Sequence, residues 1–180
     1  MWARIEIKIV RDVDPAVIGP FENADAEDGI LLNHVYVDMR GHSISDARDV
    51  VTEEAQLLLD IEAIAGDDDL LDELIQGLKE DGSDLSSFDL GTAGAIFALS
   101  AAGAAPISSC NGGLIGNDSH SSQVPHILFS INRERLAPIL TAAEAADVGL
   151  LNNSGHIEVF ADRIPKLNAF AAQLLLALDR

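Results

Sequence analysis

The chain has 180 residues, of which 48% are apolar and only 4% aromatic, and its formal net charge at pH 7 is −19. This length fits a single domain with a core of Leu, Ile, Val and Ala. The lone cysteine excludes an internal disulfide and a cysteine-based zinc cluster. The excess of acidic residues argues against direct binding of nucleic-acid phosphate.

The acidic residues are concentrated in the first half of the chain. Residues 1–90 carry a net charge of −17, whereas residues 91–180 carry only −2. A turn at residues 81–84 marks a soft boundary between an acidic half, 1–84, and a nearly neutral half, 85–180, within one domain. The chain opens without a signal-peptide pattern, and no apolar run is long enough to span a bilayer. We therefore expect a cytoplasmic protein.

Two strands and two helices are predicted in the acidic half. Residues 3–10 alternate isoleucine with charged residues, which is the period of a half-buried strand, and residues 31–39 also read as a strand. Ser45 is the predicted N-cap of an amphipathic helix that runs to Ala65. A second helix spans residues 70–80, because the aspartates just before it are favoured at the positive end of a helix dipole.

The nearly neutral half opens with an Ala-rich helix over residues 88–102, which Gly103 ends. Two strands follow, over residues 105–109 and 124–131, and a glycine-rich turn separates them. The next helix covers residues 133–146. The pattern thus gives one helix on each side of a strand pair.

Pro138 lies about one turn inside the helix predicted over residues 133–146, so we expect this helix to have a distorted first turn or a later start. The last quarter of the chain is then predicted to form a hairpin and a helix. Residues 150–161 form a β-hairpin with an Asn/Gly turn at 152–155. Asp162 caps the final helix, and Pro165 lies in its first turn.

This order of elements predicts an α+β fold, with a mixed, mostly antiparallel sheet and helices packed mainly on one face. The helix over residues 88–102 and the C-terminal helix should cover that sheet. The strand residues predicted to be buried beneath them are Ile5, Ile7, Val35, Val37, Ile127, Phe129, Ile157 and Val159.

The turn that follows strand 105–109 is the strongest candidate for a functional site. It concentrates reactive and hydrogen-bonding side chains, and its adjacent glycines let backbone amides approach a bound group closely. The predicted ligand-binding residues are Ser108, Ser109, Asn111, Gly112 and Gly113.

This segment resembles the Ser-Ser-Cys-x-Gly segment of the methyltransferases that act late in wybutosine synthesis on tRNA. The matching residues are Ser108, Ser109, Cys110 and Gly112, and His126 on the following strand is a looser match. The resemblance covers about the last 90 residues, and it implies a shared local fold more than a shared activity. A shared activity would imply S-adenosylmethionine as cofactor. The chain departs from that family at Gly113, where the family carries a basic residue, and in its acidic surface.

Cys110 is the candidate nucleophile of an enzyme at this turn, with His120, His126 or His156 as its base. A reactive thiolate needs a nearby cation or helix N-terminus. The sequence has no Lys or Arg between residues 101 and 132. The simpler interpretation is a small, partly buried cysteine that ends a strand.

No metal and no cofactor are predicted from the residues themselves. Asp118, His120 and His126 are suitable metal ligands by type, but their spacing matches no established motif. The adjacent glycines could hold a phosphate through backbone N–H groups, but no lysine accompanies them.

The acidic half carries the main function hypothesis. Clustered acids keep a protein soluble, and they also suit a basic partner. We predict a small acidic binding protein, of immunity or antitoxin type or a subunit of a complex. It would contact its protein partner through Asp67, Asp68, Asp69, Asp72 and Glu73. The alternative is an enzyme or small-ligand binder that uses the Ser108–Gly113 turn.

Overall fold

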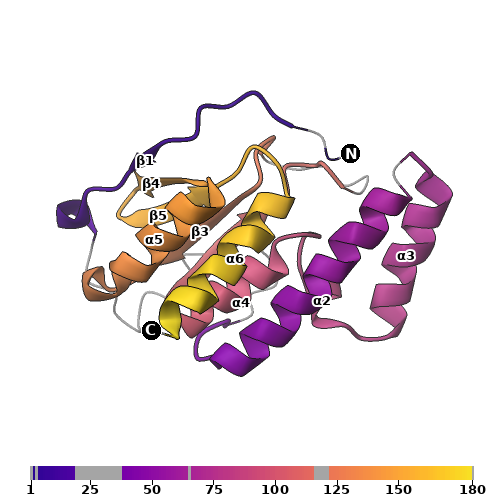
Figure 1. The fold of residues 1–180 in the computed structure, drawn as a ribbon, viewed down its shortest axis with the longest axis horizontal. Helices are drawn as coiled ribbons and strands as arrows, with labels where there is room; N and C mark the ends of the chain where they lie inside the picture. Colours follow the sequence, from indigo (N-terminus) through magenta and orange to yellow (C-terminus); the bar gives the residue numbers. More distant parts are fainter. Residues whose placement is uncertain (1, 3, 19–37, 65, 116–121, 180) are drawn as a thin grey trace.

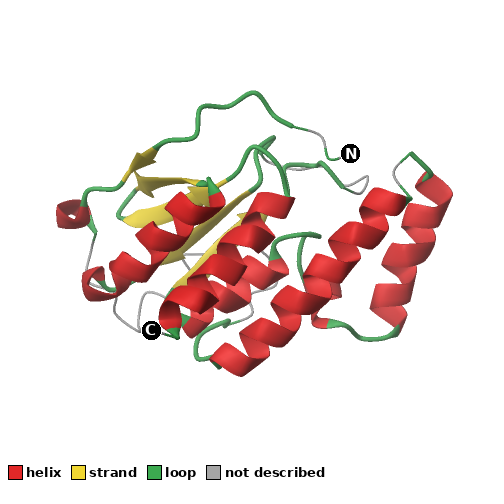
Figure 2. Ribbon diagram, viewed as in Figure 1, coloured by secondary structure: helices red, strands yellow, loops and turns green. Residues whose placement is uncertain are grey.

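The computed structural model describes residues 2, 4–18, 38–64, 66–115 and 122–179 (Figure 2), and its helices and strands contribute to one hydrophobic core. Short 3-10 helices η1, η2 and η3 cover Pro15–Val17, Asp84–Ser87 and Arg133–Arg135. The strands are β1 (Arg11–Asp12), β2 (Ala105–Cys110), β3 (His126–Ser130), β4 (Gly149–Asn153) and β5 (His156–Phe160). The helices are α2 (Ile44–Ala63), α3 (Asp68–Glu80), α4 (Ala93–Ala101), α5 (Leu136–Ala146) and α6 (Pro165–Leu178).

The five strands form one mixed sheet in the order β1-β4-β5-β3-β2. β1 runs parallel to β4, and all other neighbours are antiparallel. The β4–β5 hairpin closes through Ser154 and Gly155, whose φ angles of 53° and 89° are those of a tight two-residue turn. The predicted hairpin and the mostly antiparallel sheet are confirmed.

Helices α4, α5 and α6 cover one face of the sheet (Figure 1). Four residues of β3 and β5 that were predicted to lie beneath helices are fully buried: Ile127, Phe129, Ile157 and Val159. α2 packs beside α4 and α6, and α3 lies at the outer edge of the molecule (Figure 1). The α+β fold class is therefore confirmed. The predicted core residues Val35 and Val37 fall outside the described residues.

The N-terminal segment is not the strand predicted over residues 3–10. Only Arg11–Asp12 pairs with β4, and Ile5 and Ile7 are partly exposed instead of buried under helices. A tight local turn, in which Ile7 N–H donates to the Ile5 carbonyl (3.0 Å), interrupts the extended backbone. The isoleucines of this irregular segment are partly buried, whereas the alternating Glu6 and Lys8 are exposed.

α2 begins slightly earlier than predicted because Ser43, and not Ser45, caps it. Asp46 N–H donates to Ser43 Oγ (3.1 Å), and Ser43 N–H donates to the Asp46 carboxylate (3.1 Å). This reciprocal capping box satisfies two backbone donors that the helix itself leaves without partners. α3 begins at Asp68, two residues before the predicted start, because Asp67 caps it by accepting from Leu70 N–H (3.2 Å).

α4 is shorter than the predicted helix over residues 88–102 and begins only at Ala93. Gly91 has a φ of +87°, in the left-handed region, and therefore cannot belong to the helix. Its position also leaves no room for a side chain, because a Cβ there would lie 2.1 Å from Ile164 Cγ2. The predicted helix end is correct, since Gly103 follows the C-cap with a φ of +82°.

The last two helices differ in how well their starts were predicted. α5 follows a 3-10 turn, so the distorted start expected from Pro138 is confirmed. α6 begins at Pro165, but Asp162 does not cap it. Asp162 is buried and forms ion pairs with Arg4 (2.9 Å) and Lys166 (3.1 Å), which hold the N-terminal segment to the start of α6.

Candidate functional site

Asn111 organises the turn that follows β2. Its side-chain amide donates to the carbonyls of Ile115 (3.2 Å) and Leu90 (3.5 Å), and its carboxamide oxygen accepts from Gly113 N–H (3.0 Å). Its backbone N–H donates to the Asp89 carboxylate (3.2 Å). Asn111 is buried, so its polar atoms are committed to fixing the turn against the segment before α4.

The other residues of the predicted ligand-binding set surround this anchor. Gly112 and Gly113 have φ angles of +74° and +68°, which only glycine adopts readily. Gly112 N–H donates to Cys110 Sγ (3.3 Å), and Gly113 N–H donates to Asn111, so both amides are used within the turn. Ser108 is exposed and Ser109 is half-buried on β2.

Cys110 and His126 are brought together by the sheet. They are direct cross-strand partners in the β2–β3 ladder, and such partners have neighbouring side chains. Cys110 is buried, and its Sγ donates to the Ser122 carbonyl (3.9 Å). His126 Nδ1 lies 2.9 Å from the Val124 carbonyl, which can only accept a hydrogen bond, so Nδ1 carries the proton.

His156, another base considered for that enzyme, lies elsewhere. His156 is hydrogen-bonded through Nδ1 to Ser130 Oγ (2.7 Å), at the opposite end of β3 from His126. His120 and Asp118 fall outside the described residues. Among the residues that are described, no three His, Cys, Asp or Glu side chains are grouped closely enough to hold a metal ion.

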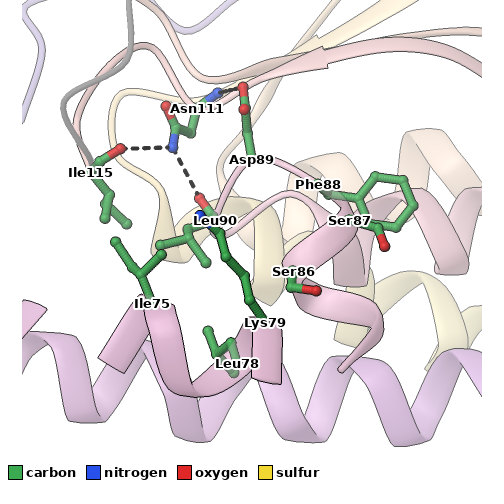
Figure 3. Close-up of a pocket in the computed structure, with 10 residues that line it drawn as sticks. All are labelled: Ile75, Leu78, Lys79, Ser86, Ser87, Phe88, Asp89, Leu90, Asn111 and Ile115. Carbon is green, nitrogen blue, oxygen red and sulfur yellow. Dashed lines mark hydrogen bonds between the residues drawn. The ribbon is translucent and has the colours of Figure 1, made fainter. Parts of the chain in front are cut away.

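A pocket of about 300 Å³ lies between α3 and the Asn111 turn (Figure 3). Its apolar lining comprises Ile75, Leu78, Phe88, Leu90 and Ile115. Its polar lining comprises Lys79, Ser86, Ser87, Asp89 and Asn111. Of the predicted ligand-binding residues, Asn111 alone lines this pocket. α3 and the connection before α4 supply most of its wall, and the sequence pattern did not indicate that they meet there.

The five predicted partner-binding residues are all exposed, at the N-cap and along the first turns of α3. Asp67 caps the helix through its bond to Leu70 N–H. Leu70 is itself 44% exposed in the midst of these acids. α3 contacts the rest of the domain through the partly buried Leu71, Leu74 and Leu78. The helix therefore presents an acidic side to solvent and an apolar side to the domain.

A buried carboxylate that sequence reasoning missed lies between three helices. Glu54 on α2 is fully buried, and its carboxylate accepts from Gly94 N–H (3.1 Å) and from Asn168 Nδ2 (2.9 Å). Burial raises the pKa of Glu54, although the hydrogen bonds from Asn168, Gly94 and Ala93 oppose that rise. A signal existed, because Glu54 falls on the same helical stripe as the buried Val50, Val51, Leu57, Leu58 and Ile61.

None of the helices in the described residues combines the length and apolar character needed to cross a bilayer. No protein-family model matches the chain, and neither a curated protein nor a solved structure matches it.

Proposed function

We propose that this chain is a protein-binding module whose acidic helix α3 recognises a basic protein partner. The observation that carries the proposal is that, among the described residues, no base pairs with the acids of this helix. Of the five predicted partner-binding carboxylates, only that of Asp67 accepts a hydrogen bond within the described ranges, and none is bonded to a base.

Some aspartates elsewhere in the fold are paired with bases. Asp147 pairs with Arg11 (3.0 Å) and Lys166 (2.7 Å), and Asp162 pairs with Arg4 and the same Lys166. The three bases of these pairs, Arg4, Arg11 and Lys166, lie far from α3 in the sequence. Like charges that remain unpaired on one surface repel each other, and a bound cationic surface relieves that repulsion.

Leu70 supports an interface at this helix. It is exposed, and its neighbours three residues away on either side are Asp67 and Glu73. Protein interfaces commonly combine an apolar centre with a polar rim, and a few buried anchors supply most of their affinity. The partner surface that fits is therefore a basic one with an apolar recess for Leu70.

Two triple charge reversals test the proposal. Asp69→Lys/Asp72→Lys/Glu73→Lys alters α3 but keeps the Asp67 cap intact, so the helix should still form. Glu6→Lys/Glu134→Lys/Glu144→Lys is the matched control, because it changes the net charge equally at exposed positions elsewhere. Circular dichroism establishes that both variants keep the helices of the wild type.

Each protein is immobilised and exposed to extract of the native cell, and the retained proteins are quantified by mass spectrometry. We expect a partner that high salt releases from the wild type, that the control variant retains and that the α3 variant loses. If the α3 variant retains the same partner, the acidic helix is not the binding surface. Its charge would then serve solubility.

A further inference from the structure

A second pocket, of about 430 Å³, lies where the N-terminal segment meets the C-terminal half of α2 and the start of α6. These two helices pack against each other (Figure 1). Most of the wall is apolar and includes Trp2, Leu58, Leu59 and Pro165. A cavity of roughly 150 Å³ is enough to hold one benzene ring. The pocket therefore has room for a ligand with two fused rings.

Asn168 gives this pocket a hydrogen-bond acceptor. The residue is only 9% exposed, and its amide group donates to the Val51 carbonyl (3.0 Å) and to the Glu54 carboxylate (2.9 Å), so both donors are used. Within the described part of the chain its Oδ1 accepts no hydrogen bond, and the only fully buried side-chain oxygen or nitrogen there that lacks one is Asp162 Oδ1. Asn168 Oδ1 is therefore accessible, and Asn168 lines the pocket. It offers an acceptor to a ligand that carries a donor.

The charged residues of the lining favour a ligand without net charge. Arg163 and Glu62 are both exposed, and Glu62 already takes part in another interaction. Arg163 disfavours a cation, whereas Glu62 and the net charge of −19 disfavour an anion. Among the described residues, no hydrogen bond or ion pair involves the Arg163 guanidinium, which can therefore stack on an aromatic face. Trp2 adds a large aromatic surface to the wall.

We propose that this pocket binds a small, neutral, bicyclic aromatic molecule of the size of indole that carries one hydrogen-bond donor. The donor bonds to Asn168 Oδ1, and the rings pack among Trp2, Leu58 and Pro165. The N–H of an indole ring donates and the ring has no acceptor, which matches a site whose buried polar atom only accepts. The acidic side of α3 is no part of this site, so partner binding can fail without affecting the proposal.

Calorimetric titration of the whole chain with indole tests the proposal. Benzofuran is the matched comparison ligand, because it has the same shape but no donor. Indole-3-acetate and tryptamine add a negative and a positive charge to the same ring. We expect saturable binding of one indole per chain, with benzofuran at least about tenfold weaker and both charged ligands also weaker. The absence of saturable indole binding up to about 5 mM overturns the proposal. Equal or tighter binding of any of the three comparison ligands overturns it as well.

Trp2 reports where indole binds. It is the only tryptophan of the chain, so isotope-labelled protein gives a single ring N–H signal in heteronuclear NMR spectra, and unlabelled indole adds none. We expect this signal to shift and to saturate at the same indole concentrations as the calorimetric titration. A Trp2 signal that stays in place while indole binds shows that the ligand lies elsewhere and overturns the assignment.

A substitution that fills the pocket gives a second location test. Ala55→Phe places a ring in the pocket from α2, where Ala55 is half-buried. Ala177→Phe is the matched control, because Ala177 is a half-buried alanine on α6 outside the pocket. We expect Ala55→Phe to weaken indole binding at least about tenfold and Ala177→Phe to leave it unchanged.

Circular dichroism establishes that both variants keep the helices of the wild type. Unchanged indole binding by a folded Ala55→Phe overturns the assignment. If Ala55→Phe does not fold, the benzofuran comparison and the Trp2 signal decide, because both are measured on the wild type.

Discussion

Asn168 on α6 donates its side-chain amide to the buried carboxylate of Glu54 on α2 at 2.9 Å. The same amide group donates to the Val51 carbonyl at 3.0 Å, so it joins the two helices twice. The other carboxylate oxygen accepts from Gly94 N–H in the first turn of α4. Thr92 makes no side-chain cap there. Glu54 therefore caps α4 from a neighbouring helix, and one carboxylate fixes the arrangement of three helices.

Alanine substitution at two helical glycines should have opposite effects on stability. At Gly94 an added Cβ would lie 2.5 Å from Glu54 Oε2 and 3.3 Å from Val51 Cγ2, whereas at Gly77 in α3 it would meet no atom within 4 Å. Gly94→Ala should therefore cost about 1–3 kcal/mol through overpacking. Gly77→Ala should stabilise by about 0.5–1 kcal/mol through helix propensity. Urea denaturation measures both, and two changes of the same sign would contradict the packing around Glu54.

Glu54 should also make stability depend on pH. Its pKa is raised by burial from its ordinary value of 4.5, so the folded state holds this proton more tightly than the unfolded state. The stability that the proton contributes is present in full below the unfolded pKa and is lost as the pH rises through the folded pKa. We expect the unfolding free energy of the wild type, minus that of Glu54→Gln, to fall as the pH rises above the ordinary glutamate pKa of 4.5.

Urea denaturation of both proteins across this range gives the difference directly. All other carboxylates are shared by the two proteins, so their titration largely cancels. A difference that stays constant or rises with pH would mean that Glu54 is ionised in the fold without cost.

Local patterns predicted most of the described elements, because those elements are set by neighbouring residues. The buried stripe of α2 and the hairpin turn at Ser154–Gly155 are read directly from spacing and turn chemistry. The errors arose where a distant contact decides the outcome. Gly91 must approach Ile164 closely, and Asp162 is drawn into ion pairs with Arg4 and Lys166 instead of capping α6.

The candidate pocket could be predicted only in part. The glycine-rich turn after β2 indicated Asn111, and the acidic run indicated the exposed side of α3. Lys79 and Asp89 are ten residues apart and lie on different elements, so only the docking of α3 against the Asn111 turn places them on one pocket. No periodicity in the sequence specifies that docking.

A matched pair of leucines on α6 tests the assignment of its buried face. Leu174 is fully buried, as its place in the predicted stripe required, whereas Leu176 is 55% exposed. Leu174→Ala should cost about 2–5 kcal/mol, from lost burial and from the cavity it leaves. Leu176→Ala should change stability by less than about 0.5 kcal/mol. Thermal denaturation that shows similar losses for both would mean that the orientation of α6 is different.

The reactivity of Cys110 distinguishes the proposed binding protein from the alternative, an enzyme with a nucleophilic thiol. Cys110 is buried, and its sulfur lies between two backbone contacts, since Gly112 N–H donates to it and it donates to the Ser122 carbonyl. His126 is directly opposite on β3 and uses Nδ1 to contact Val124. Its Nε2 is thus the nitrogen that could accept a proton, so the alternative hypothesis has a definite base to test.

We expect iodoacetamide to label Cys110 in the folded chain at least about tenfold more slowly than in urea, because a buried sulfur is shielded from the reagent. Cys110→Ser should preserve partner binding and change stability by less than about 1 kcal/mol, since a hydroxyl can take over both backbone contacts. Mass spectrometry of the alkylated chain measures the rates. Fast labelling of the folded protein at about pH 6 would contradict this expectation, because an ordinary free thiol is almost wholly protonated there. If His126→Ala then slowed that labelling, the pair would be a functional dyad, and the proposed function would have to give way to an enzyme built on β2 and β3.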